Sequence, residues 1–391
     1  MRLARIETVQ RFRRSVGLFD DRSHKGRWGV DRTFSGGVID RFHNRFHSGH
    51  TMDDVTEVPE GSRPVTIHMV AASAGVSAST VSRALNFPEL VKPGTRERVL
   101  ACVEKLGYQP NRAARSLALG RTASLGLIVP DIANPFFAPF VKVVQRRVRE
   151  ANYALFLADT DEDPSTEVEL ALAMSQQVDG LILCSPRMPG RKLRTIAAKT
   201  PVVVANRLSR SVPSIALDFG PGIKQAVAHV HALGHRRCAF LSGPSGSWSN
   251  QQRLRAFRAQ CESYGIELVV LGPYEPVFSG GYRGADEALA AKVTAVFAYN
   301  DMVALGVMSR LSDRNVRVPD EMSVVGFDDI EVASMTSPPL TTVAIPVDTV
   351  AKASAALLLS LLAETTPQRP AAQELATRLV IRNTTGVPKE D

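Results

Sequence analysis

The chain has 391 residues, 44% of them hydrophobic, which is enough for more than one buried core and too long for a single average domain. It carries 47 Lys and Arg against 39 Asp and Glu, a formal net charge of +8. The four cysteines form no Cys-x-x-Cys pair and no cluster with histidine, so we expect a reducing compartment, no disulfide, no metal and no cofactor. The sequence contains neither an apolar run long enough to span a bilayer nor an N-terminal signal peptide, so we expect a soluble, cytoplasmic protein.

The charge is unevenly distributed along the chain. Residues 1–51 hold 11 basic and 5 acidic residues, and residues 52–61 hold 4 acidic residues and no basic one. Residues 62–122 hold 9 basic and 3 acidic residues, whereas residues 123–391 hold 27 of each. A basic excess can indicate contact with nucleic acid, contact with a membrane surface, or nothing.

Residues 1–61 are rich in Arg, His, Gly and Asp and show no sustained periodicity, so we interpret them as a disordered extension. Translation from Met52 would remove most of this extension, so an untranslated stretch is a second interpretation. A tail whose basic residues touch DNA is a third.

Three short helical patterns follow over residues 64–109, and the first two, PVTIHMVAASAGVSASTVSRALN, predict helices joined by a tight turn at Gly75. The apolar residues that would pack these helices together are Val70, Ala71, Ala74, Val76, Val81 and Ala84. This spacing is typical of the helix-turn-helix, whose second helix enters the DNA major groove by its N-terminal end. The residues that would face DNA are Ser77, Ala78, Ser79, Thr80, Ser82 and Arg83. Arg83 could donate two hydrogen bonds to a guanine; the alternative is a helical hairpin with a solvated polar face.

From Leu125 onward, eight strand-like runs alternate with amphipathic helical windows: LGLIVP, YALFLADT, GLILCSP, PVVVANR, CAFLSGP, ELVVLGP, AVFAYND and SVVGFDD. This pattern predicts parallel sheets with helices on both faces, and the number of strands favours two lobes with a cleft between them. Parallel sheets bind ligands outside the carboxyl ends of their strands. The polar residues at predicted strand ends are Asp131, Asn134, Asp159, Arg207, Asp218, Asn300, Asp301 and Asp328.

In this order the motifs resemble the lac-repressor (LacI) family of bacterial transcription regulators. The matching strings are VTIHMVAASAGVSASTVSRALN, TRERVLACVEKLGYQPNRAARSLALG, GLIVPDIANPFF, LGHRR, FAYNDMVALG, VPDEMSVVGFDDI and PPLTTV. The resemblance implies a small all-α helix-turn-helix head and an α/β, two-lobed sensor domain like periplasmic binding proteins. We divide the chain into the extension (1–61), the DNA-binding head (62–110), a hinge helix or linker (111–122) and the effector-binding and dimerisation domain (123–391). The implied function is a sequence-specific regulator, a repressor, whose operator binding is allosterically controlled by a small-molecule effector, a sugar or sugar derivative.

The resemblance also implies that two hinge helices pair across a homodimer on a palindromic operator and enter the minor groove. Leu117 would then be the apolar wedge that opens a base step. The other residues that would line the groove or its phosphates are Asn111, Arg112, Ala114 and Arg115. In the alternative, Leu117 is a linker leucine packed on the head.

Strand ends and family motifs together give the effector-binding candidates Phe136, Phe137, Asp159, Arg207, Arg253, Asn300 and Asp328. The aromatic rings could close on an apolar ligand face while the polar groups satisfy hydroxyls. In the alternatives, Phe137 belongs to the core and Asp301 caps a helix that starts at Met302. The family often has an aromatic residue where this chain has Pro276.

Two further departures from the family concern the head. Met69 stands where the family usually has Asp, and VKPGT loses a Ser cap, so we expect Thr95 to cap the third helix and start it a turn later.

The chain has no Gly-x-Gly-x-x-Gly after a strand, no phosphate loop and no Gly-x-Ser-x-Gly elbow, so we expect no enzyme; a dehydrogenase is the enzymatic alternative. A transport-type binding protein would need a signal peptide and no DNA-binding head. The C-terminal IRNTTGVPKED has no leucine heptad, so we expect a dimer without the lac-type tetramer.

Overall fold

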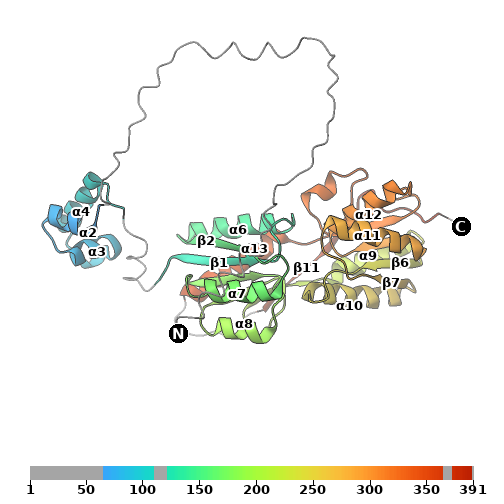
Figure 1. Cartoon of the computed structure of the whole chain (residues 1–391), viewed down its shortest axis with the longest axis horizontal. Coiled ribbons are helices and arrows are strands. Elements are labelled where there is room, and N and C mark those ends of the chain that lie inside the picture. Colours follow the sequence, from blue (N-terminus) through green and yellow to red (C-terminus); the bar gives the residue numbers. More distant parts are fainter. Residues whose placement is uncertain (1–64, 110–120, 364–371, 390–391) are drawn as a thin grey trace, which may run out of the picture. The chain divides into compact units, whose positions relative to one another are not determined.

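The computed structural model describes residues 65–109, 121–363 and 372–389, which form a small helical head and an α/β part (Figure 1). The expectations about the extension 1–61 and about the hinge helix that begins at Asn111 fall outside the described residues. The described residues contain no helix long and apolar enough to cross a membrane.

The head consists of three α-helices and a short 3-10 helix: α2 (Ile67–Ala74), α3 (Ala78–Asn86), η1 (Pro88–Leu90) and α4 (Pro93–Leu106). Gly75 ends α2 with a φ of 65°, as the predicted tight turn requires. Val70, Val81 and Val99 are fully buried where the three α-helices meet.

The expected start of α4 is wrong. The helix begins at Pro93 with Lys92 in the N-cap position and no side-chain cap, while Thr95 lies inside the first turn. Proline is favoured there because the first-turn N–H groups have no partner within the helix.

The α/β part contains two six-stranded sheets. The sheet of the N-terminal lobe has the order β11-β5-β4-β3-β1-β2 and is parallel throughout. Its strands are β1 (Ser124–Val129), β2 (Ala154–Asp159), β3 (Gly180–Cys184), β4 (Val202–Ala205), β5 (Ser214–Asp218) and β11 (Ala372–Ala376). Its helices are α6 (Phe137–Glu150), α7 (Pro164–Met174), α8 (Gly190–Ala197) and α13 (Val347–Ala363).

The sheet of the C-terminal lobe has the order β12-β10-β9-β8-β6-β7, and only β12 within it runs antiparallel to its neighbour. Its strands are β6 (Arg237–Leu241), β7 (Glu267–Leu271), β8 (Ala295–Ala298), β9 (Ser323–Asp328), β10 (Thr341–Ala344) and β12 (Arg378–Val380). Its helices are α9 (Gly220–Ala232), α10 (Trp248–Ser263), α11 (Phe278–Ala290), α12 (Asp301–Asp313) and the 3-10 helix η2 (Glu331–Ser334).

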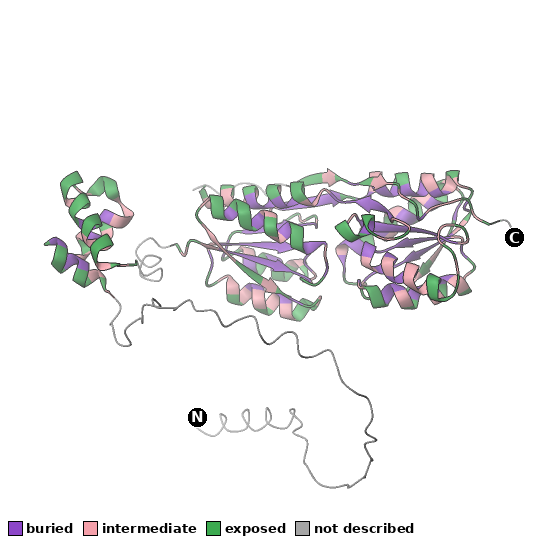
Figure 2. Cartoon of the chain, turned by 90° about the horizontal axis from the view of Figure 1, so that it is seen from above, coloured by how far each residue is buried: buried purple, intermediate pink, exposed green. Residues whose placement is uncertain are grey.

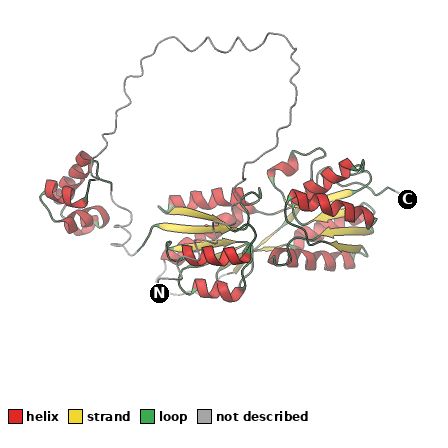
Figure 3. Ribbon diagram, in the orientation of Figure 1, coloured by secondary structure: helices red, strands yellow, loops and turns green. Residues whose placement is uncertain are grey.

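The predicted two-lobed α/β fold is confirmed, and all eight predicted strands are present (Figure 3). The central strands of both sheets are buried, the edge strands β2 and β7 are partly exposed, and the helices expose their outer faces (Figure 2). The prediction missed β5, β10, β11 and β12, which are short or carry polar residues such as Glu374.

The chain passes between the two sheets three times, after β5, after β10 and after β11. Two of these crossings are joined by Thr377, whose backbone N–H and side-chain hydroxyl both donate to the carbonyl oxygen of Asp218. The carboxyl ends of β1, β3 and β4 therefore face the second lobe, which places the residues after these strands at the lobe junction.

Candidate DNA-binding surface and ligand cavity

The predicted recognition helix, α3, is capped by Ser77. The Ser77 hydroxyl accepts a hydrogen bond from the Thr80 N–H at 3.2 Å and lies 2.8 Å from the Ser79 hydroxyl oxygen. Ser77, Ser79 and Arg83 are exposed, and Thr80 and Ser82 are half-buried. Ala78 is half-buried as well and packs against the head core. The exposed side chains at the N-terminal end of α3, Ser77 and Ser79, are small, so this end of the helix can approach a DNA groove closely.

The five predicted hinge residues lie outside the described residues. They are Asn111, Arg112, Ala114, Arg115 and Leu117.

A small polar cavity lies between the two lobes of the α/β part. The space between its lining residues amounts to about 330 Å³, a volume that includes the part that opens to solvent. Its lining residues are Asn134, Phe136, Phe137, Glu162, Ser185, Arg187, Asn206, Ser249, Arg253, Pro276, Tyr299, Asn300 and Asp328. The sequence prediction placed a ligand site at strand ends, and Ser185, Asn206, Tyr299 and Asp328 all lie there.

Arg253 of α10 and Asp328 at the end of β9 form a buried ion pair in the wall of this cavity. The Arg253 Nη2 atom lies 3.1 Å from Asp328 Oδ1, and the Arg253 Nη1 atom donates to the Tyr299 carbonyl oxygen. The guanidinium stacks 3.7 Å from the centre of the Phe327 ring. Burial raises the pKa of Asp328 to about 6, although the neighbouring Arg253 lowers it.

Two buried polar atoms in the cavity wall have no hydrogen-bond partner within the described part of the chain. They are Arg253 Nε, a donor from the C-terminal lobe, and Asn206 Oδ1, an acceptor from the N-terminal lobe. The other end of the Asn206 amide donates to the Ser185 hydroxyl at 2.7 Å. Buried polar groups are nearly always paired, and the hydroxyl groups of a polar ligand, which both donate and accept, are of the kind that these two atoms lack.

Four residues of the cavity lining, none of them glycine, have a positive φ angle, in the left-handed region of the backbone. Their φ angles are 58° at Glu162, 50° at Ser185, 61° at Asn206 and 110° at Asp328. Such conformations cost about 1–3 kcal/mol each and cluster at functional sites, where they aim side chains at a ligand.

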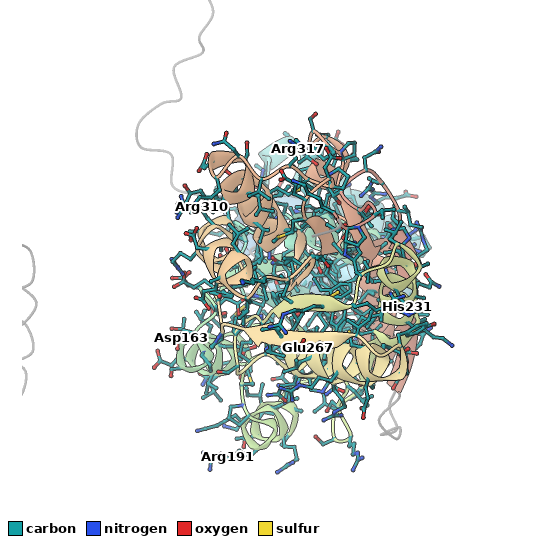
Figure 4. All side chains as sticks on the ribbon, turned by 90° about the vertical axis from the view of Figure 1, so that its right-hand side faces the viewer. Asp163, Arg191, His231, Glu267, Arg310 and Arg317 are labelled. Atoms are coloured by element: carbon teal, nitrogen blue, oxygen red, sulfur yellow. The ribbon has the colours of Figure 1, made fainter. Side chains whose placement is uncertain are left out.

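Arg187 and Glu162 form a second ion pair in the cavity wall, on the N-terminal lobe. Arg187 Nε lies 2.6 Å from Glu162 Oε2, and Arg187 Nη2 lies 2.8 Å from Glu162 Oε1. In contrast, charged side chains such as Asp163 beside α7 and Arg191 on α8 point outward (Figure 4).

The structure places two predicted effector ligands outside the cavity lining. Arg207 instead donates to the carbonyl oxygens of Pro186 and Met188, at 3.0 and 2.8 Å, and so braces the loop that carries Arg187. Asp159 is exposed and accepts from the N–H groups of Ile132 and Asp161. The buried Glu167 completes the brace, because one of its oxygens accepts from the N–H groups of Arg187 and Met188.

The expected helix cap at Asp301 is wrong, because Asn300 holds that position. Asn300 Oδ1 accepts from the Val303 N–H at 2.9 Å, and its Nδ2 donates to the Pro276 carbonyl oxygen at 2.8 Å. Asn300 lines the cavity, but each end of its amide already has a protein partner. Asp301 is fully buried and accepts from the Thr342 hydroxyl and the Ile330 N–H, and burial raises its pKa.

Phe136 and Phe137 both line the cavity and are both nearly buried. Their rings meet edge to face with centroids 5.0 Å apart, and both belong to the main hydrophobic core. The two interpretations of Phe137, ligand contact and core residue, are therefore compatible.

The sequence prediction missed Glu162, Ser185, Arg187, Asn206, Ser249 and Tyr299. Ser185 and Asn206 directly follow β3 and β4, so the strand-end rule could have included them. Glu162 and Arg187 have no such signal, because only the folded loops bring them together. Within the described residues, no group of three or more His, Cys, Asp or Glu side chains could hold a metal ion.

The chain is similar to bacterial regulatory proteins. The lacI family of bacterial regulatory proteins matches residues 66–111, and the periplasmic binding protein-like domain matches residues 227–385. Catabolite control protein A of Priestia megaterium is 32% identical over 293 residues, which cover 72% of this chain and 88% of that protein.

Solved structures show the same similarity. The lac repressor dimer bound to operator and the anti-inducer ONPF matches with a TM-score of 0.74 and 28% identity, over 83% of this chain and 100% of that chain. The complex of the transcriptional regulator CelR with cellobiose matches with a TM-score of 0.61 and 30% identity, over 82% and 100% of the two chains.

Proposed function

The chain belongs to the lacI family of bacterial regulatory proteins, and from this premise we propose that it represses transcription under the control of a small polar effector. The head would read an operator through Ser77, Ala78, Ser79, Thr80, Ser82 and Arg83. The cavity between the lobes would take the effector. The observation that carries this proposal is that one chain holds both an exposed recognition helix and a polar interlobe cavity with unpaired buried atoms.

The effector that fits this cavity best is a sugar or sugar derivative. Arg253, Asp328 and Asn206 offer charged or polar groups to hydroxyls, while the Phe136 and Phe137 rings offer an apolar face. CelR, a related regulator of the same fold, has been solved with cellobiose, which supports a saccharide.

We retain the proposed division of the chain into an extension (1–61), a head (62–110), a hinge (111–122) and an effector domain (123–391). The hinge residues Asn111, Arg112, Ala114, Arg115 and Leu117 would contact the minor groove once two chains pair on DNA. Effector binding would change lobe closure and thereby the pairing of the hinges. This coupling is reciprocal, so operator DNA would change effector affinity by the same factor.

The proposed assembly is a homodimer on a palindromic operator in the cytoplasm. Exposed apolar side chains support an interface on each lobe: Phe156 on the edge strand β2 is 53% exposed, and Met335 beside η2 is 66% exposed. The related lac repressor has been solved as a dimer on its operator. A role as an enzyme is not part of the proposal, because the cavity lining pairs its charged groups and presents no nucleophile beside a base.

A gel-shift titration on DNA from upstream of the protein's own gene tests this proposal. The protein should shift this DNA specifically, and a saccharide found by thermal-shift screening should alter the shift. Binding no tighter than to random DNA of the same length would contradict sequence-specific repression at this site, and a full screen without a stabilising saccharide would contradict the effector class.

A further inference from the structure

The cavity holds two guanidinium groups, one from each lobe, and each faces a carboxylate. Arg187 pairs with Glu162 in the N-terminal lobe, and Arg253 pairs with Asp328 in the C-terminal lobe. Guanidinium groups bind carboxylates and phosphates through paired hydrogen bonds, so without their partners these side chains would form an anion site. In the protein as it stands, the anion position beside Arg187 is taken by the chain itself.

The Glu162 carboxylate makes a bidentate contact with the Nε and Nη2 atoms of the Arg187 guanidinium. Both carboxylate oxygens are used, at 2.6 and 2.8 Å, and the remaining Arg187 Nη1 donates to the Ser185 carbonyl oxygen at 3.0 Å. Two successive left-handed residues, Asp161 at 50° and Glu162 at 58°, shape the turn that holds this carboxylate in place. A dissolved anion would have to displace a partner that is tethered at high effective concentration.

The two unpaired atoms of the cavity need one hydrogen-bond donor and one acceptor, and an anionic group supplies only acceptors. Asn206 Oδ1 needs a donor and Arg253 Nε needs an acceptor. A hydroxyl supplies both roles, whereas a carboxylate or an ionised phosphate oxygen only accepts. An anionic ligand would also meet the negative charge of Glu162, whose side chain is 21% exposed.

We propose that the Glu162–Arg187 pair is a charge filter, which makes the cavity take net-neutral polyhydroxylated ligands and reject their carboxylate and phosphate counterparts. This inference rests on the proposed function, because it assumes that the cavity is the effector site. Glu162 is the specificity-determining residue, since its carboxylate neutralises Arg187 and repels a second anion.

The first test uses inorganic phosphate as the probe on the full chain, at constant ionic strength. Glu162→Gln leaves Arg187 without its counter-charge, so thermal melting should show stabilisation by phosphate, with an affinity at least about tenfold tighter than that of the wild type. The double variant Glu162→Gln/Arg187→Gln should lose this gain. Asp329→Asn is the matched control, because it breaks a comparably buried ion pair with Arg382 that does not line the cavity.

The same response to phosphate in the wild type, Glu162→Gln and Asp329→Asn would overturn the filter.

A second test needs no substitution and therefore does not depend on the variant folding. Calorimetry on the wild type compares neutral sugars with their acids and phosphates: D-glucose with D-gluconate and D-glucose 6-phosphate, and D-galactose with D-galacturonate. Any acid or phosphate that binds more tightly than its neutral counterpart contradicts the proposal.

The two tests separate this inference from the proposed function. If no neutral saccharide binds the wild type, the saccharide effector is wrong, while the phosphate test still decides whether Glu162 blocks anions. For a neutral sugar that binds, Glu162→Gln should shift the preference toward its acid by at least about tenfold.

Discussion

Arg253 and Asp328, 75 residues apart in the sequence, form a buried ion pair across 3.1 Å in the wall of the interlobe cavity. The protein does not satisfy every polar atom of this pair, because Arg253 Nε has no partner within the described residues. Burial also makes the charged form of Asp328 less favourable and raises its pKa to about 6. A buried pair of this kind contributes little to stability by itself, yet removing one partner leaves a charge without compensation. The arrangement therefore suits a site that is completed by a ligand.

Substitution of either partner should shift the response to much higher effector concentrations. Asp328→Asn and Arg253→Met each remove a charge-assisted hydrogen bond worth about 1.5–3 kcal/mol, which weakens effector binding by roughly 10- to 150-fold. Operator binding by the ligand-free protein should stay close to that of the wild type in gel shifts. The double variant should lose less than the sum of the single losses, because both side chains serve one ligand. If either single variant binds the effector with the wild-type dissociation constant, the substituted residue has only a structural role.

Effector affinity should fall as the pH drops below about 6. The deprotonated carboxylate of Asp328 accepts charge-assisted hydrogen bonds from hydroxyls through both oxygens, whereas the protonated group has lost its charge and accepts only through its carbonyl oxygen. Burial raises the pKa of Asp328 to about 6. Below that pH the protonated fraction dominates, so affinity should decrease by up to about tenfold per pH unit. Calorimetric titrations between pH 5 and 8 on the wild type and Asp328→Asn measure this effect. A wild-type profile as flat as that of Asp328→Asn would show that Asp328 does not titrate with ligand binding.

The close packing of α11 on α12 should depend on glycine. A Cβ atom at Gly306 would collide with the Phe278 carbonyl oxygen and the Tyr282 backbone nitrogen, neither of which can move without separating the helices. We expect Gly306→Ala to destabilise the protein by about 3 kcal/mol or more in urea unfolding. Gly94→Ala in α4 is the control, since nothing lies within 4 Å of its Cβ position and alanine favours a helix by up to about 1 kcal/mol. Equal stability of the two variants would show that the helices can separate without loss.

The sequence was enough to predict the fold but only part of the cavity. Hydrophobic periodicity found the long buried strands, yet it missed β10, whose residues Thr341–Ala344 are buried through their neighbours and not through their own apolarity. The strand-end pattern led to Asp328, whereas Arg253, which lies inside α10, was predicted only from the resemblance to the lacI family.

The pair of Glu162 and Arg187 could not be predicted in this way. Their contact depends on two loops with left-handed turns, and no spacing in the sequence encodes which loop side chains meet. Arg207 shows the converse error, because a strand-end position put it among the ligands while the fold uses it to brace the loop of residues 186–188.

The recognition helix gives a test that does not depend on the effector. Arg83 is exposed in the last turn of α3, and its fork of donors matches the O6 and N7 acceptors of guanine. Arg83→Ala should therefore cost about 1–3 kcal/mol on the cognate operator and much less on random DNA. Competition gel shifts at fixed salt, with both DNAs in the same series, measure the two losses. Lys105→Ala, which removes a charge from the last turn of α4, is the control, and it should lower binding to both DNAs by a similar factor or not at all. If Arg83→Ala instead weakens binding to operator and random DNA equally, Arg83 contacts a phosphate and base recognition lies with other residues of α3.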